Sequence, residues 1–286
     1  MARRRRAQNR QPVTDNMLKA IAFDLWETLI TDTPELSRQQ ERLRLTRMEE
    51  ILGAHGFGAL ADRIEHAHRA LWHRCHDLYW SADLDVPCRR QIEHFLDELQ
   101  LDPSSFGEPV LEALEDAYAG AALEILPKTV EGAGQLLDAL KARGYRTGLI
   151  SNTGRTPGSV LRSILDALEL SPAIDVMVFS NEHGQCKPRA SIFEELRRGL
   201  DVASSEILFV GDNLYVDVHG AQRCGMRGIH FDPPSRGTAV APPVAHGLEI
   251  VPDARVTRLG EVLDIVEAMS EAARSSGERS ARSGQG

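Results

Sequence analysis

The sequence predicts an α/β protein whose parallel sheet is interrupted, after its first strand, by a helical insertion. Short apolar segments alternate with amphipathic helices from Pro127 onward, a pattern typical of parallel strands joined by helical crossovers. Residues 34–125 differ, because they are charged, have helical periodicity and contain no strand pattern. The chain therefore leaves the sheet, builds a helical module that can act as a lid, and returns.

The elements of the sheet follow from short apolar runs and from helical spacing. The first strand is the apolar run that ends at Asp24 in AIAFDLWETLI (20–30). After Pro127 the predicted strands are 146–151, 174–180, 206–212 and 228–232, and the predicted helices are 130–140, 159–168, 190–200, 216–225 and 259–269. A length of 286 residues suits one such domain with an insertion.

The insertion contains four amphipathic helices, at 35–52, 62–80, 89–99 and 108–121. From these patterns we expect a core of residues 17–32 and 126–269, a helical cap of residues 33–125, and two disordered ends. The ends are a basic leader, residues 1–16, and a tail of Ser, Gly, Arg and Glu, residues 270–286. Met17 directly precedes the first strand and is an alternative start.

The composition limits the classes of partner. A net charge of −9 argues against general binding of nucleic acid, and no apolar run is long enough to cross a membrane. The four cysteines are scattered, which indicates reduced thiols rather than a zinc site or a disulfide framework. We expect a cytoplasmic protein that acts on a small molecule, and its oligomeric state stays open.

Reactive residues stand at four strand ends. The first strand ends at Asp24 and the second at Ser151, Lys187 lies just beyond the third, and VGDNLYVD places Asp212 and Asp217 after the fourth. Because the carboxyl ends of parallel strands meet at one edge of a sheet, we expect these side chains to converge. Such a set suits phosphoryl transfer to a carboxylate, with Ser151 and Lys187 on the phosphoryl oxygens and Mg²⁺ between the carboxylates.

These segments resemble the haloacid dehalogenase-like hydrolases over residues 18–269, through FDLWETL, LISN, CKPRASIF and VGDNLYVDVHGAQRCGM. The resemblance implies a Rossmann-like core with an inserted cap, a Mg²⁺ ion and an aspartyl-enzyme intermediate. Carried over by position, Asp24 matches the nucleophile and Lys187 the lysine of the third motif. Ser151 and Asn152 match the substrate-binding second motif.

The resemblance also implies a metal site. Its ligands would be Asp24, Asp212 and the backbone carbonyl of Trp26. Asp217 would reach the metal, or would orient a water molecule or Lys187.

Trp26 departs from the pattern of the phosphatases in this family, which carry a second aspartate there as general acid and base. A tryptophan cannot transfer a proton to the reacting group, whereas the carbonyl ligand is unaffected. A positioned acid or base contributes about 10²- to 10⁴-fold to the rate. Its loss would strongly slow the hydrolysis of alkyl phosphates. It would slow the hydrolysis of acyl or aryl phosphates less, because their leaving groups depart readily as anions.

Other members of the family that lack this aspartate give alternatives. The 2-haloacid dehalogenases have an aromatic residue at the position of Trp26, but those that this chain resembles work without metal and lack the fourth-motif GD. Phosphonoacetaldehyde hydrolases use a lysine of the cap, and residues 33–127 contain none. P-type ATPases also lack this aspartate, but nothing else in this chain resembles them. The leading hypothesis is a Mg²⁺-dependent phosphatase of a small phosphorylated metabolite; the alternatives are a dehalogenase and a slow or non-catalytic binding protein.

Two further features could contribute to a site. His66, His68, His73 and His76 share one predicted helix with Trp72, Tyr79 and Trp80, and a histidine there could supply the missing acid. We favour a solvated polar face with the aromatic rings packed inside the cap. Arg155 follows the second motif and could bind a phosphate or a carboxylate of the substrate, or form a salt bridge.

Overall fold

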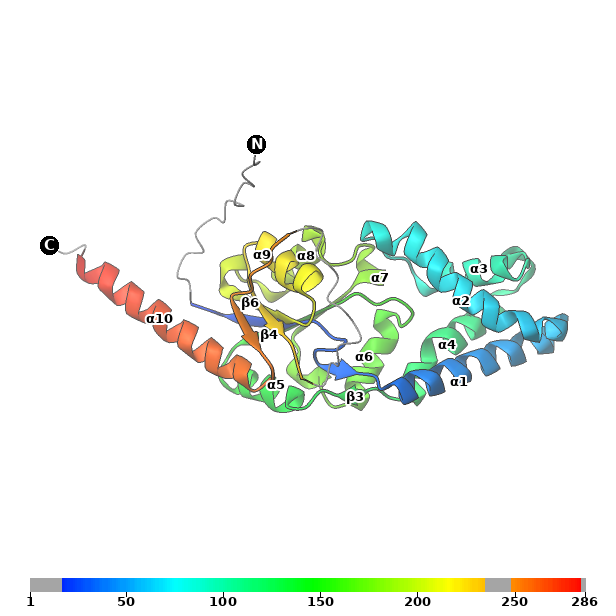
Figure 1. The fold of residues 1–286 in the computed structure, drawn as a ribbon, viewed down its shortest axis with the longest axis horizontal. Coiled ribbons are helices and arrows are strands. Elements are labelled where there is room, and N and C mark those ends of the chain that lie inside the picture. The colour runs from blue at the N-terminus through cyan, green and yellow to red at the C-terminus, as the bar shows by residue number, and fades with distance from the viewer. Residues whose placement is uncertain (1–16, 235–247, 284–286) are drawn as a thin grey trace, which may run out of the picture.

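The core of the protein is a six-stranded parallel sheet, seen in a computed structural model that describes residues 17–234 and 248–283 (Figure 1). Side chains are described up to residue 273, and the predicted leader lies outside the described residues. The order of the strands is β5-β4-β1-β6-β7-β8. Their bounds are β1 Ala20–Phe23, β4 Arg146–Ser151, β5 Val176–Phe179, β6 Ile207–Gly211, β7 Arg227–Phe231 and β8 Ala254–Val256.

Helices connect these strands. Those of the core are α5 Ala133–Ala142, α6 Gly158–Ala167, α7 Ser180–His183, α8 Ala190–Leu200, α9 Gly220–Arg223 and α10 Glu261–Ser283. Short helical turns are η5 Ser171–Ala173, η6 Ser204–Glu206 and η7 Leu214–His219. The predicted α/β class and the predicted strands are confirmed, and β8, which is only three residues long, was missed.

Helices cover both faces of the sheet because its strands alternate between two apolar clusters. Ile21 and Phe23 of β1 pack with residues of α5, α6 and α10, whereas Ala20 and Ala22 pack with residues of α8 and α9. The sheet is therefore the middle layer of three. β1 lies between β4 and β6, with Phe23 in register with Leu149 on one side and Val210 on the other. The loops that follow these three strands consequently begin side by side.

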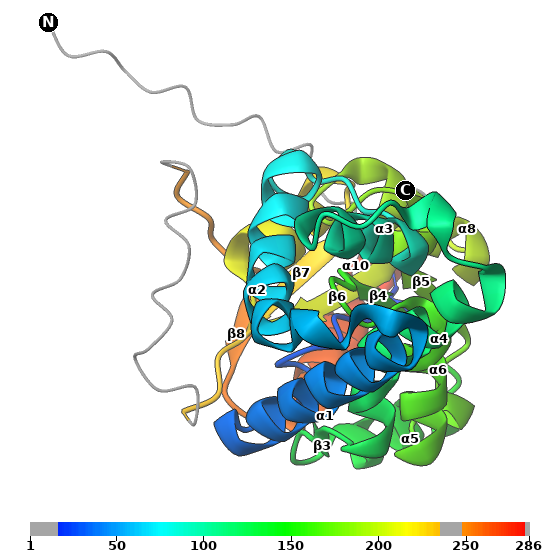
Figure 2. The ribbon, with the colours of Figure 1, turned by 90° about the vertical axis from the view of Figure 1, so that its right-hand side faces the viewer.

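The four predicted cap helices are present, as α1 Pro34–Leu52, α2 Ala61–Leu78, α3 Cys88–Glu98 and α4 Glu108–Glu124. The short turns of the cap are η1 Gly53–Phe57, η2 Gly58–Leu60, η3 Trp80–Ala82 and η4 Pro103–Ser105. The helices enclose their own apolar cluster, which includes Met48, Leu71, Ile92 and Leu114. They group at one end of the molecule, and the view onto that end shows them in front of the strands (Figures 1 and 2). The boundaries predicted for core and cap stay a prediction.

A two-stranded antiparallel ladder closes the base of the cap. It pairs β2 Ile30–Thr31, where the chain leaves the core, with β3 Lys128–Thr129, where it returns. The sequence analysis missed both strands, since each has only two residues.

The last helix is longer than the sequence predicts. We expected a helix that ends at Met269 and a disordered tail from Ser270, yet α10 continues to Ser283. Ser270 and Ala273 are buried, and the Ser270 hydroxyl lies 3.1 Å from the Tyr145 hydroxyl, so the helix keeps packing beyond the predicted end. No helix among the described residues is long and apolar enough to cross a membrane.

The inner face of the cap carries polar side chains that are buried. Arg44 of α1 is 4% exposed and donates through Nε to the Tyr118 carbonyl at 2.6 Å. His68 of α2 is 1% exposed, so the predicted solvated face is wrong for this residue, whereas His66, His73 and His76 are exposed. The aromatic prediction holds for two of the three rings, because Tyr79 and Trp80 pack half-buried against the apolar cluster of the cap, whereas Trp72 is 40% exposed.

From the burial of His68 we expect the free energy of unfolding to fall in mild acid. Burial, and then the positive charge of Arg155 and Arg44, lowers its pKa to about 3 in the folded protein. The unfolded chain binds this proton near pH ~6.5, so the stability is complete above that pH and is lost as the pH falls towards 3. Between about pH 7.5 and about pH 5.5 this one group removes about 1.3 kcal/mol from the free energy of unfolding.

Urea unfolding at both pH values measures this loss. We expect the loss to be smaller by about 1.3 kcal/mol in His68→Gln than in the wild type. His66→Gln, which changes an exposed histidine of the same helix, is the control. An equal loss in the wild type and in His68→Gln would contradict the account.

Candidate active site

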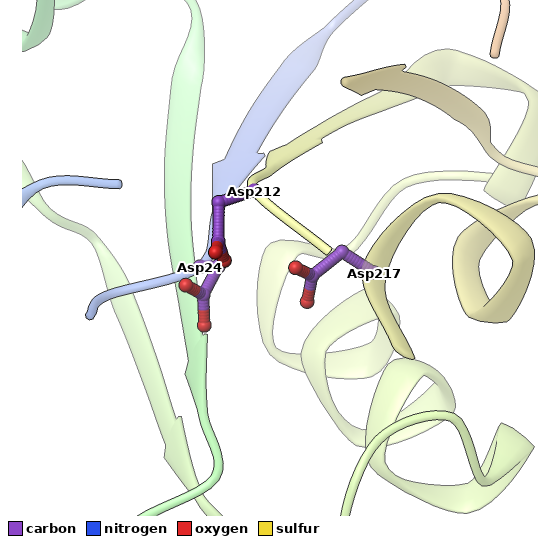
Figure 3. Close-up of side chains that lie close together, drawn as sticks. All are labelled: Asp24, Asp212 and Asp217. Carbon is purple, nitrogen blue, oxygen red and sulfur yellow. The ribbon is translucent and has the colours of Figure 1, made fainter. Parts of the chain in front are cut away.

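Three carboxylates converge at the carboxyl edge of the sheet. Asp24 follows β1, Asp212 follows β6, and Asp217 lies in η7, one turn further along the chain. Each offers an oxygen within 4.8 Å of the other two, and Figure 3 shows the three side chains pointing towards one another. The structure thus brings together the three aspartates that the sequence singles out.

A tight turn after β1 fixes the first of these carboxylates. The Leu25 carbonyl accepts hydrogen bonds from the backbone N–H groups of residues 28–30, and Glu27 adopts a left-handed φ of 59°. The turn points the fully buried Thr28 back at the strand end, where its hydroxyl donates to Asp24 Oδ2 at 3.2 Å. Thr28 was not among the predicted site residues; its only signal in the sequence is a small hydroxyl residue four positions after the aspartate.

Lys187 is the centre of the charged cluster. Its Nζ donates to Asp24 Oδ1 at 2.5 Å and to the Ile150 carbonyl at 3.0 Å, and forms an ion pair with Asp217 Oδ1 at 2.8 Å. The side chain is 1% exposed. Burial alone would lower the pKa of Lys187, but the charges of Asp217 and Asp24 outweigh it and raise the pKa. The lysine therefore stays protonated and neutralises part of the carboxylate charge.

Asn152 holds the backbone that carries this lysine. Its Oδ1 accepts from the Lys187 N–H at 2.8 Å, and its Nδ2 donates to the Lys187 carbonyl at 3.1 Å. Both amide atoms are therefore engaged by one peptide segment. These bonds position the segment that carries Lys187, and the substrate-binding role of Asn152 stays a prediction.

Ser151 and Arg155 lie in or next to the loop that follows β4. The Ser151 hydroxyl is fully buried and has no hydrogen-bond partner among the described residues. A buried hydroxyl without a partner is costly, which suits a group that binds an oxygen of the substrate. Arg155 lies further from the strand, and its guanidinium stacks on the Trp72 ring of the cap at 4.5 Å.

Asp217 is held close to the strand that carries Asp212. Its Oδ2 accepts from the Asn213 N–H at 2.9 Å, and the side chain is 1% exposed. Burial raises the pKa of Asp217, the Lys187 charge opposes this, and the Asp24 charge adds to it. Three carboxylates converge around one ammonium in this site, and a hard divalent cation with oxygen ligands fits this donor set.

Trp26 lies in the turn after Asp24, half-buried against the larger apolar cluster of the core. Its backbone pairs with that of Ile30, so the side chain sits on a fixed segment. The position that bears an aspartate in the related phosphatases therefore carries an apolar ring here. The exposed cap histidines do not form hydrogen bonds to any of the three aspartates in the described part of the chain.

A buried carboxylate of the cap, which the sequence analysis missed, ties the cap to the site. Asp85 is 5% exposed and accepts through Oδ2 from the hydroxyls of Thr153, at 3.0 Å, and Ser180, at 2.5 Å. Its Oδ1 accepts from Trp80 Nε1 at 3.0 Å. Thr153 lies two residues after Ser151, so the cap braces the loop that carries that hydroxyl. No local signal distinguishes Asp85 from the many surface acids of the cap.

Comparison with known proteins identifies the class. The sequence profile of the family described as haloacid dehalogenase-like hydrolase matches residues 18–225, which is well over half of the chain. The chain belongs to the haloacid dehalogenase-like hydrolases, and it is a hydrolase by that membership.

Individual relatives agree with this class, and a solved structure shares the fold. A glyceraldehyde 3-phosphate phosphatase of Pyrococcus abyssi is 30% identical over 215 residues, covering 75% of this chain and 82% of that protein. A ribulose-1,5-bisphosphate 5-phosphatase of Halopiger xanaduensis is 32% identical over 154 residues, covering 54% of this chain and only 63% of that protein. The crystal structure of a 2-haloacid dehalogenase from Pseudomonas syringae shares the fold with a TM-score of 0.61 and 23% identity, covering 88% of this chain and 99% of that one.

The glycine before Asp212 gives a prediction about the packing of the site. A Cβ at Gly211 would lie 2.5 Å from Cβ, Cγ and Oδ2 of Asp217, so Gly211→Ala must displace this carboxylate. We expect a loss of about 1–3 kcal/mol in the free energy of unfolding, measured in urea. Gly120→Ala is the control, because a Cβ there meets nothing within 4 Å inside α4. Equal stability of both variants would contradict the tight contact.

Proposed function

We propose that this hydrolase is a Mg²⁺-dependent phosphatase of a small phosphorylated metabolite, with Asp24 as the nucleophile. The observation that carries the proposal is the cluster of three carboxylates around the buried Lys187 ammonium. A carboxylate nucleophile, a buried lysine and a buried hydroxyl at one sheet edge are the groups that phosphoryl transfer to an aspartate requires.

The residues of this chain have distinct tasks in that reaction. An oxygen of Asp24 attacks phosphorus, and the bond from phosphorus to the leaving oxygen breaks, so that the leaving group takes the electron pair. Water then attacks the aspartyl phosphate and releases phosphate and the free carboxylate. Thr28 and Lys187 hold one Asp24 oxygen each, while the unpartnered hydroxyl of Ser151 is available to a phosphoryl oxygen.

Asp24, Asp212 and Asp217 would hold the metal, with the Trp26 carbonyl as a further oxygen ligand. Once bound, Mg²⁺ supplies positive charge that offsets the charge of the phosphoryl group and of the carboxylates. Without it, the converging carboxylates would repel an anionic substrate.

The names of the relatives support the substrate class. Two of them are phosphatases of small phosphorylated sugars, which agrees with a phosphatase of a small metabolite here. Trp26 narrows the range of substrates, because without a general acid at that position the leaving group must depart as an anion. Acyl phosphates and aryl phosphates are therefore better substrates than alkyl phosphates.

A 2-haloacid dehalogenase is the second candidate, and the aromatic side chain of Trp26 favours it. A halide leaves as an anion and needs no acid. The carboxylate cluster argues against this candidate, because a metal-free displacement gains nothing from three converging carboxylates.

Dependence on metal and on Asp24 is the first prediction about activity. Phosphate release from acetyl phosphate and p-nitrophenyl phosphate is expected with Mg²⁺, and is expected to stop when a chelator is added. Asp24→Asn removes the nucleophile and should lower the rate by more than about 10³-fold. Phosphate assays with and without the chelator measure both effects.

Asp138→Asn is the matched control, since Asp138 is an exposed carboxylate of α5. Phosphate release that survives chelation would contradict the metal site. Release of chloride from a 2-chloro acid in the presence of chelator, with no phosphate release, would support the dehalogenase instead.

The second prediction about activity concerns the missing acid. Trp26→Asp places a protonatable group where the related phosphatases carry one, so turnover of an alkyl phosphate should rise by about 10- to 100-fold or more. Turnover of acetyl phosphate should change much less, because its leaving group needs no proton. The ratio of kcat for the two substrates is the measurement.

Trp26→Asn separates acid catalysis from the removal of a large ring. The asparagine side chain has nearly the shape of the aspartate side chain, but it cannot transfer a proton to the leaving group. An equal gain in both variants would show that space, not a proton, limits the wild type.

A further inference from the structure

A group of basic and neutral polar side chains lies where the cap meets the loop after β4. This basic cluster consists of Arg44, His68, Gln91, Tyr118 and Arg155. Gln91 of α3 donates through Nε2 to the Gly154 carbonyl at 2.9 Å, and its Oε1 accepts from the Tyr118 hydroxyl at 3.0 Å. The cap side chains are therefore fixed against the segment that bears Arg155.

Arg44 is a buried cation without an anionic partner. It lies 4% exposed beside Tyr118, with Cζ 5.6 Å from the ring, and no carboxylate among the described residues pairs with it. Burying an unpaired guanidinium is costly, and burial together with the nearby Arg155 charge lowers the pKa of Arg44 to about 10. A structural role needs no such charge, whereas an anion bound beside it would offset the cost.

Arg155 is held in a geometry that suits recognition of an anion. Its guanidinium stacks on the face of Trp72, which itself packs against Trp80 with 4.6 Å between the ring centroids. Stacking fixes the plane of the guanidinium and leaves its N–H edge available for a carboxylate or a phosphoryl group. In the part of the chain that the structure describes, no carboxylate pairs with that edge, so the salt bridge that was one alternative for Arg155 is not formed there.

His68 completes the cluster. It lies one helical turn before Trp72 on α2, and neither ring nitrogen has a hydrogen-bond partner among the described residues. The closest ion-pair contact of its Nδ1 is with Glu41 Oε1, at 3.8 Å, which is too long for a hydrogen bond. A neutral, fully buried imidazole with both nitrogens free can donate one hydrogen bond to a ligand and is unlike a group that only fills space.

We propose that Arg44, Arg155 and His68 form a subsite for a second anionic group of the substrate, a carboxylate or a second phosphoryl group. This inference rests on the proposed phosphatase function, because the first anion is the phosphoryl group at Asp24. Arg155 lies in the loop that follows β4, four residues after Ser151, the last residue of that strand, so one small molecule can carry both anions. Two guanidiniums exclude a second cation from this place.

Isothermal titration calorimetry in the Asp24→Asn background tests the subsite without turnover. With Mg²⁺ present, 2-phosphoglycolate is compared with 2-hydroxyethyl phosphate, in which an alcohol replaces the carboxylate. We expect 2-phosphoglycolate to bind about 10- to 100-fold more tightly. The second pair is propane-1,3-diol bisphosphate and 3-hydroxypropyl phosphate. The pair with the larger ratio of dissociation constants shows whether the subsite prefers a carboxylate or a second phosphoryl group.

Arg155→Met and Arg44→Met are expected to remove that preference. Each should weaken the binding of the doubly anionic ligand by about 10- to 100-fold and change the affinity for its alcohol partner by less than about threefold. Arg42→Met, an exposed arginine on the same helix as Arg44, is the charge-matched control and should change neither affinity. If Arg44→Met does not fold, Arg44→Lys is used in its place. Arg155→Met tests the proposal independently, because Arg155 lies in the loop after β4 and not in the cap.

The outcomes separate this inference from the proposed function. Equal affinity of the parent for both members of each pair would overturn the subsite and leave the phosphatase proposal standing. Equal weakening of both members by Arg155→Met would assign this arginine to the shared phosphoryl group and would also overturn the subsite. If the Asp24→Asn parent binds none of the four ligands and the wild type releases no phosphate from acetyl phosphate, both proposals are overturned.

Discussion

The structure of the site depends on one buried interaction, the Lys187 ammonium between Asp24 and Asp217. A lysine that is 1% exposed would be costly without these carboxylates, and the carboxylates would repel each other without the lysine. The three side chains come from segments that are distant in the sequence, so their mutual dependence fixes three loops at once. Asn152 extends the constraint to a fourth segment, because its amide holds the backbone of Lys187.

Polar contacts attach the inner face of the cap to this arrangement, beside an apolar contact in which Val160 of α6 packs against the apolar cluster of the cap. Asp85 accepts from Thr153 and Ser180, and Gln91 donates to Gly154, so two cap residues bond the loop that follows β4. Polar contacts of this kind can be exchanged with water at modest cost, whereas each domain keeps its own apolar cluster. The arrangement is compatible with movement of the cap relative to the core while both remain folded.

Trp26 shows how a change in chemistry can leave the fold intact. The turn after β1 is formed by backbone hydrogen bonds to the Leu25 carbonyl and by the left-handed Glu27, neither of which needs a particular side chain at position 26. A ring can therefore replace a proton-transferring group there without moving Asp24 or Thr28. Within the proposed function, this separates the charge arrangement that binds a phosphoryl group from the acid that assists its leaving group.

The sequence by itself determined the α/β class, the helical insertion and the aspartates that converge, because apolar runs and strand ends are local signals. It did not reveal β8 or the β2–β3 ladder, which are too short to produce a periodicity, and it ended α10 at Met269 although Ser270 and Ala273 are still buried. Only the tertiary structure decided the places of Thr28, Asp85, Arg44 and His68. Their significance lies in burial and in partners far away in the chain, and a charged or polar residue on an amphipathic helix carries no local sign of either.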